Sequence, residues 1–244
     1  PDPGDDRLTG GEGEAVYLPA LHTAEIGAAA RMETLLATPV SRVDIDVDRA
    51  LGWFEERHRI DLAEEQREAI RRAVSRKVLV ITGGPGTGKT TLVNAVVEIL
   101  EKKSRKILLA APTGRAARRL GDLTGREART IHRMLEFSPR TATFERNPAR
   151  PLDVDVLVLD EVSMVDIVLF HHVLKALPPH CQLVLVGDVD QLPSVGPGNV
   201  LRDLIGSRAV DVVRLTKIFR QAEESLIITN AHRANRGEMP VLTP

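Results

Sequence analysis

Residues 83–90 read Gly-Gly-Pro-Gly-Thr-Gly-Lys-Thr, which matches the pattern G-x-x-x-x-G-K-[ST]. An apolar run at 78–81 precedes them and a helix-compatible run at 92–100 follows them. In such a strand–loop–helix context, the glycines let the backbone curl and present N–H groups to phosphate oxygens. The N-terminus of the following helix adds a positive dipole end. The pattern therefore predicts a phosphate-binding loop, in preference to a glycine-rich turn that binds nothing.

Two side chains of this loop have specific chemistry. We expect Lys89 to reach the β- and γ-phosphates of a nucleotide and the Thr90 hydroxyl to hold Mg²⁺. The residues expected to contact the nucleotide in and around the loop are Gly84, Pro85, Gly86, Thr87, Gly88, Lys89, Thr90 and Thr91.

A pair of carboxylates follows a second apolar run, Val-Leu-Val-Leu at 156–159. Asp160 is expected to bind Mg²⁺ through water, because hard divalent cations prefer oxygen ligands. Glu161 is expected to polarise the water that attacks the nucleotide. An ordinary acidic strand end is the alternative, and the phosphate loop upstream makes it the poorer interpretation.

Three polar residues elsewhere are further candidates for the same site. Gln191 follows the apolar run 182–187 and is positioned to hydrogen-bond the γ-phosphate or the attacking water. Arg220 follows the run 210–215 and is either a charge-stabilising arginine or a surface charge. Gln66 either pairs its amide with N6 and N7 of adenine or is a solvated glutamine. Spacing alone leaves both alternatives open for Arg220 and Gln66.

A local basic stretch lies at 114–133, where six arginines face only one aspartate and one glutamate, an excess of +4. Arg115, Arg118 and Arg119 share one side of a helix at spacings of three and four. Such a side suits a nucleic-acid backbone, and it is equally what a solvated helix face looks like. The net charge of the whole chain, −1, gives no reason to expect nucleic acid.

Alternating strand and helix patterns must position these residues. Apolar runs typical of strands buried on both faces lie at 78–82, 106–111, 154–160, 182–187 and 210–215. Helical patterns lie between them at 89–103, 114–121, 130–136, 165–177, 198–206 and 223–236. The order predicts an α/β domain with a mainly parallel, doubly wound sheet.

Helices also precede the phosphate loop. We expect one at 23–37, one that Asp46 or Asp48 caps and that runs through Arg57, and one at 62–76. Later, residues 137–152 contain three prolines, which disfavour a helix and predict a hairpin or, alternatively, a plain surface loop.

Composition limits the remaining classes. With 244 residues and 43% hydrophobic residues, the chain is long enough for one or two domains with a real core. No apolar run approaches the roughly 18 residues of a membrane helix, and residues 1–13 do not resemble a secretion signal. The single cysteine, Cys181, lies in an apolar run, which favours a buried strand position over a reactive thiol and is typical of a cytoplasmic protein. No N-K-x-D or L-S-G-G-Q sequence is present, which argues against GTPases and transporter ATPases.

Taken together, the stretches resemble superfamily 1 helicases, most closely the RecD-like branch of the 5′-to-3′ subfamily (the alpha subunit of exodeoxyribonuclease V and its stand-alone relatives). The matching stretches, in the order of the family, are 62–70, 83–90, 111–117, 130–135, 158–166, 187–193 and 215–221. The resemblance implies a RecA-like P-loop NTPase domain that uses ATP and Mg²⁺ to move along single-stranded DNA and unwind duplex DNA in repair or recombination.

The resemblance also implies residue roles. It makes Gln66 the adenine-reading residue, Arg220 the motif IV arginine, and Gln191 the residue that couples nucleotide state to DNA grip. Thr113, Arg115 and His132 fall where the family holds single-stranded DNA. Residues 137–152 fall where such enzymes carry a strand-separating pin.

The family pattern further predicts how the chain is divided. Residues 1–60 are expected to be the helical end of an N-terminal domain, and residues 61–244 the first motor domain; no second motor domain is recognised. Two alternatives stay open: a nucleotide- and DNA-binding module without turnover, and the helicase part of a relaxase. The family implies a monomer with no membrane partner and, for the parent protein, subunits of a nuclease complex.

Overall fold

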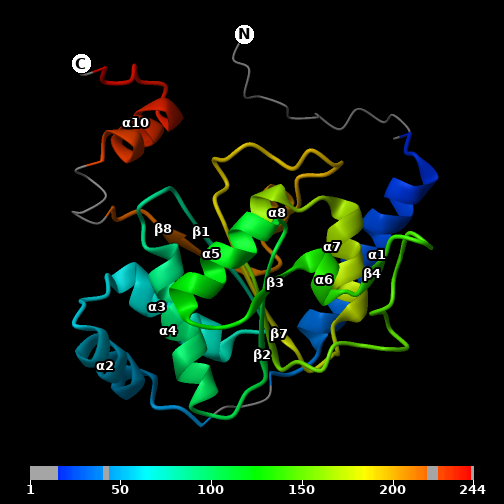
Figure 1. Ribbon diagram of the computed structural model, residues 1–244, viewed down its shortest axis with the longest axis horizontal. Helices are drawn as coiled ribbons and strands as arrows, with labels where there is room; N and C mark the ends of the chain where they lie inside the picture. The colour runs from blue at the N-terminus through cyan, green and yellow to red at the C-terminus, as the bar shows by residue number, and fades with distance from the viewer. Residues whose placement is uncertain (1–15, 41–43, 219–224, 243–244) are drawn as a thin grey trace.

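A computed structural model describes residues 16–40, 44–218 and 225–242. Its centre is a six-stranded sheet of order β3-β2-β6-β7-β1-β8, in which all neighbours run parallel (Figure 1). The strands are β1 (Val78–Gly83), β2 (Ile107–Ala111), β3 (Ala128–Thr130), β6 (Val156–Leu159), β7 (Gln182–Gly187) and β8 (Asp211–Leu215). The predicted α/β class with a parallel sheet is confirmed.

The central strands are buried on both faces, as their continuous apolar runs predict. In β1, Val80 faces one hydrophobic core while Leu79 and Ile81 face the other. Ile81 pairs with Val186 of β7 and with Val213 of β8. The carboxyl end of β1, from which the phosphate loop emerges, is therefore held between two strands.

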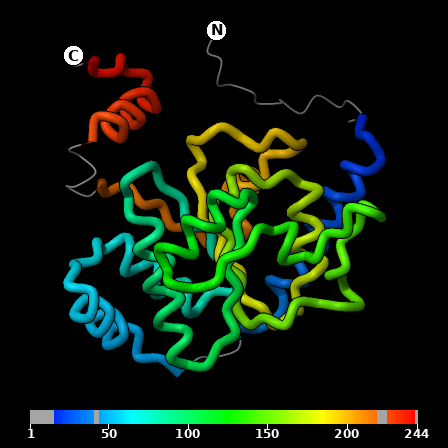
Figure 2. Tube along the Cα trace, viewed as in Figure 1, coloured from blue at the N-terminus to red at the C-terminus, as the bar shows by residue number. Residues whose placement is uncertain are grey.

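Helices cover both faces of the sheet (Figures 1 and 2). One core includes residues of α1 (Pro19–Ala37), α6 (Ile131–Met134), α7 (Ile167–Ala176) and α8 (Val200–Ser207). The other includes residues of α2 (Val47–His58), α3 (Glu64–Ser75), α4 (Lys89–Glu101) and α5 (Gly114–Thr124). The last described helix is α10 (Leu226–Asn235).

The two helices upstream of residue 60 lie on opposite faces of this sheet. Ala28 of α1 belongs to the same core as Phe170 of α7, and Phe54 of α2 is only 1% exposed in the other core. Of the two aspartates considered as caps for α2, the structure uses Asp46, whose carboxylate accepts a hydrogen bond from the Arg49 N–H at 3.1 Å.

Three short elements complete the fold. The edge strand β3 was not predicted, because three residues reading Ala-Arg-Thr have no apolar run. The helix predicted at 130–136 is a single turn, α6. Within the Pro-rich stretch, β4 (Phe137–Ser138) and β5 (Thr143–Phe144) pair antiparallel, and a 3-10 turn, η1 (Val162–Met164), follows β6.

The cysteine prediction is confirmed, because Cys181 is fully buried and burial raises the pKa of its thiol to about 12. Such a thiol carries almost no reactive thiolate at neutral pH. Among the described residues, no helix combines the length and apolar character needed to span a bilayer.

Candidate active site

The phosphate loop leaves the carboxyl end of β1 and enters α4 at Lys89. Gly86 and Gly88 have φ angles of 79° and 77°, a region that side chains with a Cβ rarely occupy. The Thr87 hydroxyl donates to the Gly84 carbonyl at 2.9 Å and closes the loop. At Gly83 a Cβ would lie 2.7 Å from the carbonyl oxygen of Leu215, so the loop needs a glycine there for lack of space.

Lys89 folds over its own loop. Its ammonium group donates to the carbonyl of Gly83 and, at 2.9 Å, to that of Gly84. Burial lowers the pKa of Lys89, while nearby Asp188 and then Glu161 act in the opposite direction. If an anion replaced these carbonyls as hydrogen-bond acceptor, the Lys89 ammonium would already lie at the mouth of the loop.

Asp160 and Glu161 stand at the carboxyl end of β6. The carboxylate of Asp160 accepts a hydrogen bond from the N–H of Glu161 at 2.9 Å. Glu161 has φ 54°, an uncommon left-handed conformation for a residue with a Cβ. Burial raises the pKa of Asp160, and burial together with the charge of Asp160 raises the pKa of Glu161. A carboxylate of raised pKa is a better proton acceptor when ionised.

Gln191 lies in the loop after β7, where its side-chain carbonyl accepts a hydrogen bond from the Ser163 hydroxyl at 3.4 Å. Ser163 belongs to η1, which directly follows Glu161. The loop after β7 is thereby joined to the loop after β6.

Gln66 is 1% exposed, which excludes the solvated alternative considered for it. Its amide oxygen accepts from the Ala63 N–H at 3.0 Å, and its amide nitrogen faces the carbonyls of Thr87 and Gly88 at 3.4 Å each. In this conformation Gln66 joins the start of α3 to the phosphate loop.

These elements enclose a cavity of about 790 Å³ at the carboxyl edge of the sheet. Its wall contains the predicted residues Gln66, Pro85, Gly86, Thr87, Gly88, Lys89, Thr90, Thr91, Asp160, Glu161 and Gln191. Gly84 lies beside the cavity, under the ring of His232 from α10, which donates to the Pro85 carbonyl at 2.9 Å. Arg220 lies outside the described residues.

Sequence reasoning missed some residues of this site. Arg119 and Leu123 of α5 line the cavity, although Arg119 was considered only as part of a basic helix side. Asp188 is 2% exposed, and its charge acts on Lys89. The position of Asp188 directly after the apolar run 182–187 is a signal that could have identified it. Nothing in the sequence shows that the side chain of Arg119 faces the cavity.

The cavity fits a nucleoside triphosphate with a divalent cation. The positive φ angles at Gly86 and Gly88 shape the backbone cradle that phosphate oxygens require. Thr90 and Asp160 provide a hydroxyl and a carboxylate on the cavity wall, which are oxygen donors of the kind Mg²⁺ prefers. Loops at the carboxyl ends of parallel strands are where such folds bind ligands.

The candidate DNA residues follow two neighbouring strands. Thr113 and Arg115 come after β2, and His132 comes after β3, which pairs with β2 at Ala111 and Thr130. The Thr113 hydroxyl accepts the N–H of Ala116 at 3.2 Å and caps α5. His132 is exposed and contacts the hairpin, with its ring 5.5 Å from that of Phe137.

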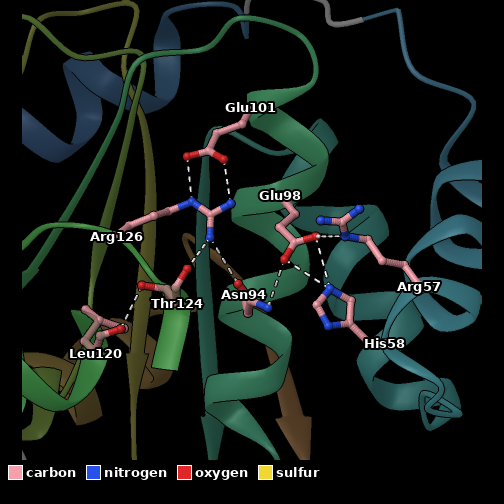
Figure 3. A network of polar contacts seen from close by, with 8 residues as sticks. All are labelled: Arg57, His58, Asn94, Glu98, Glu101, Leu120, Thr124 and Arg126. Atoms are coloured by element: carbon pink, nitrogen blue, oxygen red, sulfur yellow. Dashed lines mark hydrogen bonds and ion pairs between the residues drawn. The ribbon is translucent and has the colours of Figure 1, made fainter. Parts of the chain in front are cut away.

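A polar network ties α4 to the end of α5 (Figure 3). Arg126, just beyond α5, forms a two-pronged ion pair with Glu101 of α4, with nitrogen–oxygen distances of 2.6 and 2.5 Å. It also donates to Asn94 of α4 at 3.2 Å and to the carbonyl of Thr124, the last residue of α5. The helix that begins at the phosphate loop and the helix that begins at Thr113 are thus held together.

Comparisons with known proteins agree with this site. A family model described as an AAA domain matches residues 66–197. The ATP-dependent RecD2 DNA helicase of Deinococcus radiodurans is 41% identical over 230 residues, which cover 94% of this chain and 31% of the relative. The RecD subunit of the RecBCD enzyme of Mycolicibacterium smegmatis is 42% identical over 186 residues, which cover 65% of this chain and 34% of the relative.

A solved structure is similar as well. The crystal structure of Pif1 helicase from Candida albicans superposes with a TM-score of 0.56 and 25% identity, and the match covers 74% of this chain and 45% of that one. The chain spans about a third of the length of the curated relatives it matches.

Proposed function

Because the chain belongs to the AAA-domain family and, within it, to the RecD-like helicases as a first motor domain, we propose that it hydrolyses ATP to drive 5′-to-3′ movement on single-stranded DNA. The observation that carries the proposal is the cavity, which brings Lys89, Thr90, Asp160 and Glu161 onto one wall. The proposed setting is duplex unwinding in DNA repair or recombination, in the cytoplasm.

The proposed mechanism assigns a task to each of these side chains. Lys89 leaves the carbonyls of Gly83 and Gly84 and binds the β- and γ-phosphates. Thr90 and Asp160 would hold Mg²⁺, which neutralises charge on the phosphate oxygens when bound. Glu161 orients the attacking water and accepts its proton, a role that its raised pKa favours.

Other residues couple hydrolysis to movement in this proposal. Gln191 senses the terminal phosphate and transmits its loss through Ser163 and η1. Gln66 reads adenine and Arg220 stabilises charge on the γ-phosphate; both roles rest on the family resemblance. On the DNA side, the residues proposed to hold the single strand are Thr113, Arg115 and His132.

The remaining proposals concern the larger protein. Residues 61–244 act as the motor unit, preceded by a helical segment at 1–60. The hairpin of β4 and β5 acts as the strand-separating pin, since it projects next to His132. The whole helicase acts as a monomer or joins the subunits of a nuclease complex, as the RecBCD name of one relative indicates for that protein.

Steady-state ATP hydrolysis with and without single-stranded DNA tests the proposal. Glu161→Gln should keep ATP binding and lose about 10²- to 10⁴-fold in turnover. Glu127→Gln is the matched control, because Glu127 is exposed and paired only with Arg129 among the described residues. Normal turnover in Glu161→Gln would exclude Glu161 as the base. ATP binding without turnover in the unmodified chain would favour a nucleotide- and DNA-binding module.

A further inference from the structure

Arg119 is a cation of the cavity wall that the mechanism above does not use. It lies on the second turn of α5, and its side chain is exposed. Among the parts of the chain that the structure describes, it forms no hydrogen bond and no ion pair within 4.0 Å. An exposed guanidinium that faces a cavity and has no partner there is available to a ligand.

The charge of Arg119 acts on the phosphate end of the cavity. Its positive charge opposes the rise that burial causes in the pKa values of Asp160 and Glu161, and it adds to the fall that burial causes in the pKa of Lys89. Lys89, Asp160 and Glu161 line the same cavity as Arg119. Arg119 therefore faces the groups that surround the terminal phosphate in the proposed function.

The backbone of Arg119 is held in place. Its neighbour Leu120 is 1% exposed in the core, and the carbonyl of Leu120 accepts from the Thr124 hydroxyl at 2.8 Å. The ion pair between Arg126 and Glu101 fixes the end of the same helix against α4 (Figure 3). Because the backbone is already fixed, binding of a ligand by Arg119 needs to order only the side chain.

We propose that Arg119 is an additional phosphate-binding residue of this site and contacts the terminal phosphate of ATP. The inference rests on the proposed function and names one more residue of the same site. Arginine suits the task, because its planar group donates two parallel hydrogen bonds to phosphate oxygens. The contact distinguishes ATP from ADP, because the terminal phosphate is the group that ADP lacks.

The contact also links two ligands through one helix. Thr113 caps α5 and Arg115 lies in its first turn, and both are candidate DNA residues. Arg119 lies one turn further along the same helix. Loss of the terminal phosphate would release α5 at its nucleotide side while DNA holds its N-terminus.

Titration of fluorescent ATP and ADP with Mg²⁺, in the absence of DNA, tests the proposal. Arg119→Ala should weaken ATP binding about tenfold or more, as expected for the loss of a charge-assisted hydrogen bond, and ADP binding by less than about twofold. The ATP affinity of Arg119→Lys should fall between those of the wild type and Arg119→Ala, because lysine keeps the charge and loses the two-pronged geometry. Arg202→Ala, an exposed arginine of α8, is the matched control and should change neither affinity.

The outcomes separate this inference from the proposed function. Equal weakening of ATP and ADP in Arg119→Ala, or no weakening of either, would overturn the terminal-phosphate contact. If Lys89→Ala still weakened ATP binding in that experiment, the proposed function would stand without Arg119. Absence of ATP binding in the unmodified chain would overturn both.

Discussion

The loss of ATP affinity in Lys89→Ala can be worked out from the interactions that Lys89 gives up and gains when the nucleotide binds. Nucleotide binding takes the Lys89 ammonium from the carbonyls of Gly83 and Gly84, at a net cost of about 1 kcal/mol for each hydrogen bond. A unit charge pair at about 4 Å, with an effective dielectric constant of about 20, contributes about 4 kcal/mol. The difference of about 2 kcal/mol corresponds to about 30-fold in the dissociation constant.

A thermal unfolding assay converts this difference into a temperature. With ATP and Mg²⁺ at 100 times the wild-type dissociation constant, the wild type should gain about 2.7 kcal/mol, or about 5–11 °C in Tm for a chain of this size. Lys89→Ala should gain about 0.9 kcal/mol, or about 2–4 °C, at the same concentration.

Lys106→Ala is the matched control for this assay. Lys106 is an exposed lysine that pairs with Asp153 and precedes β2, at the edge of the sheet opposite the cavity. Its variant should keep the full shift of the wild type.

Two results would refute the reasoning about Lys89. One is a full nucleotide-induced shift in Lys89→Ala, which would mean that the phosphates do not replace the carbonyls. The other is a large fall in Tm of the nucleotide-free variant. Burial lowers the pKa of Lys89, so its charged form costs stability below that pKa. This cost offsets the roughly 1 kcal/mol that each carbonyl hydrogen bond contributes, so removal of the side chain should change the stability of the empty protein only slightly.

Three further predictions concern the site and the hairpin. Glu161→Gln should raise the Tm of the nucleotide-free protein at neutral pH, because burial raises the pKa of Glu161 and its ionised form costs stability. This gain should shrink as the pH falls through the raised pKa, where the wild-type carboxyl takes up its proton; a gain that stayed constant down to about pH 4 would contradict the assignment. Gly83→Ala should lower the free energy of unfolding in urea by about 1–3 kcal/mol, because the new Cβ would lie 2.7 Å from the Leu215 carbonyl oxygen. Gly52→Ala, whose Cβ meets nothing within 4 Å, should be neutral or stabilising, and an equal loss in both variants would argue against a steric cause at Gly83. In the full-length enzyme, replacing the hairpin tip 139–142 with a shorter turn should leave DNA-stimulated ATP hydrolysis intact and reduce unwinding in a fork-substrate assay; unchanged unwinding would remove the proposed pin.

Much of the site could be predicted from local sequence because its chemistry sits at strand ends. Lys89, Asp160 and Gln191 each follow an apolar run, and the carboxyl ends of parallel strands share one edge of the sheet. Recognition of the runs was therefore enough to expect these side chains near one another. The short strand β3 escaped the same reasoning, since an edge strand of three residues has no such run.

The order of the strands could not be read from these runs. Every central strand is buried on both faces and has a similar apolar run, so the hydrophobic pattern does not show that β7 lies between β1 and β6. Nor does it say that Leu215 of β8 comes close enough to Gly83 to forbid a side chain there. The glycines with positive φ in the same loop, by contrast, were identifiable from the motif alone.

The sequence by itself determined the phosphate loop, the carboxylate pair and the alternation of strand and helix, because each depends on neighbours along the chain. Tertiary structure alone decided that Gln66 is buried against the loop and that Arg119 faces the cavity. Helical periodicity identifies which residues share a side of α5, but it does not identify what that side meets. The direction of Arg119 follows from the packing of α5 against α4, which joins residues that are far apart in the sequence.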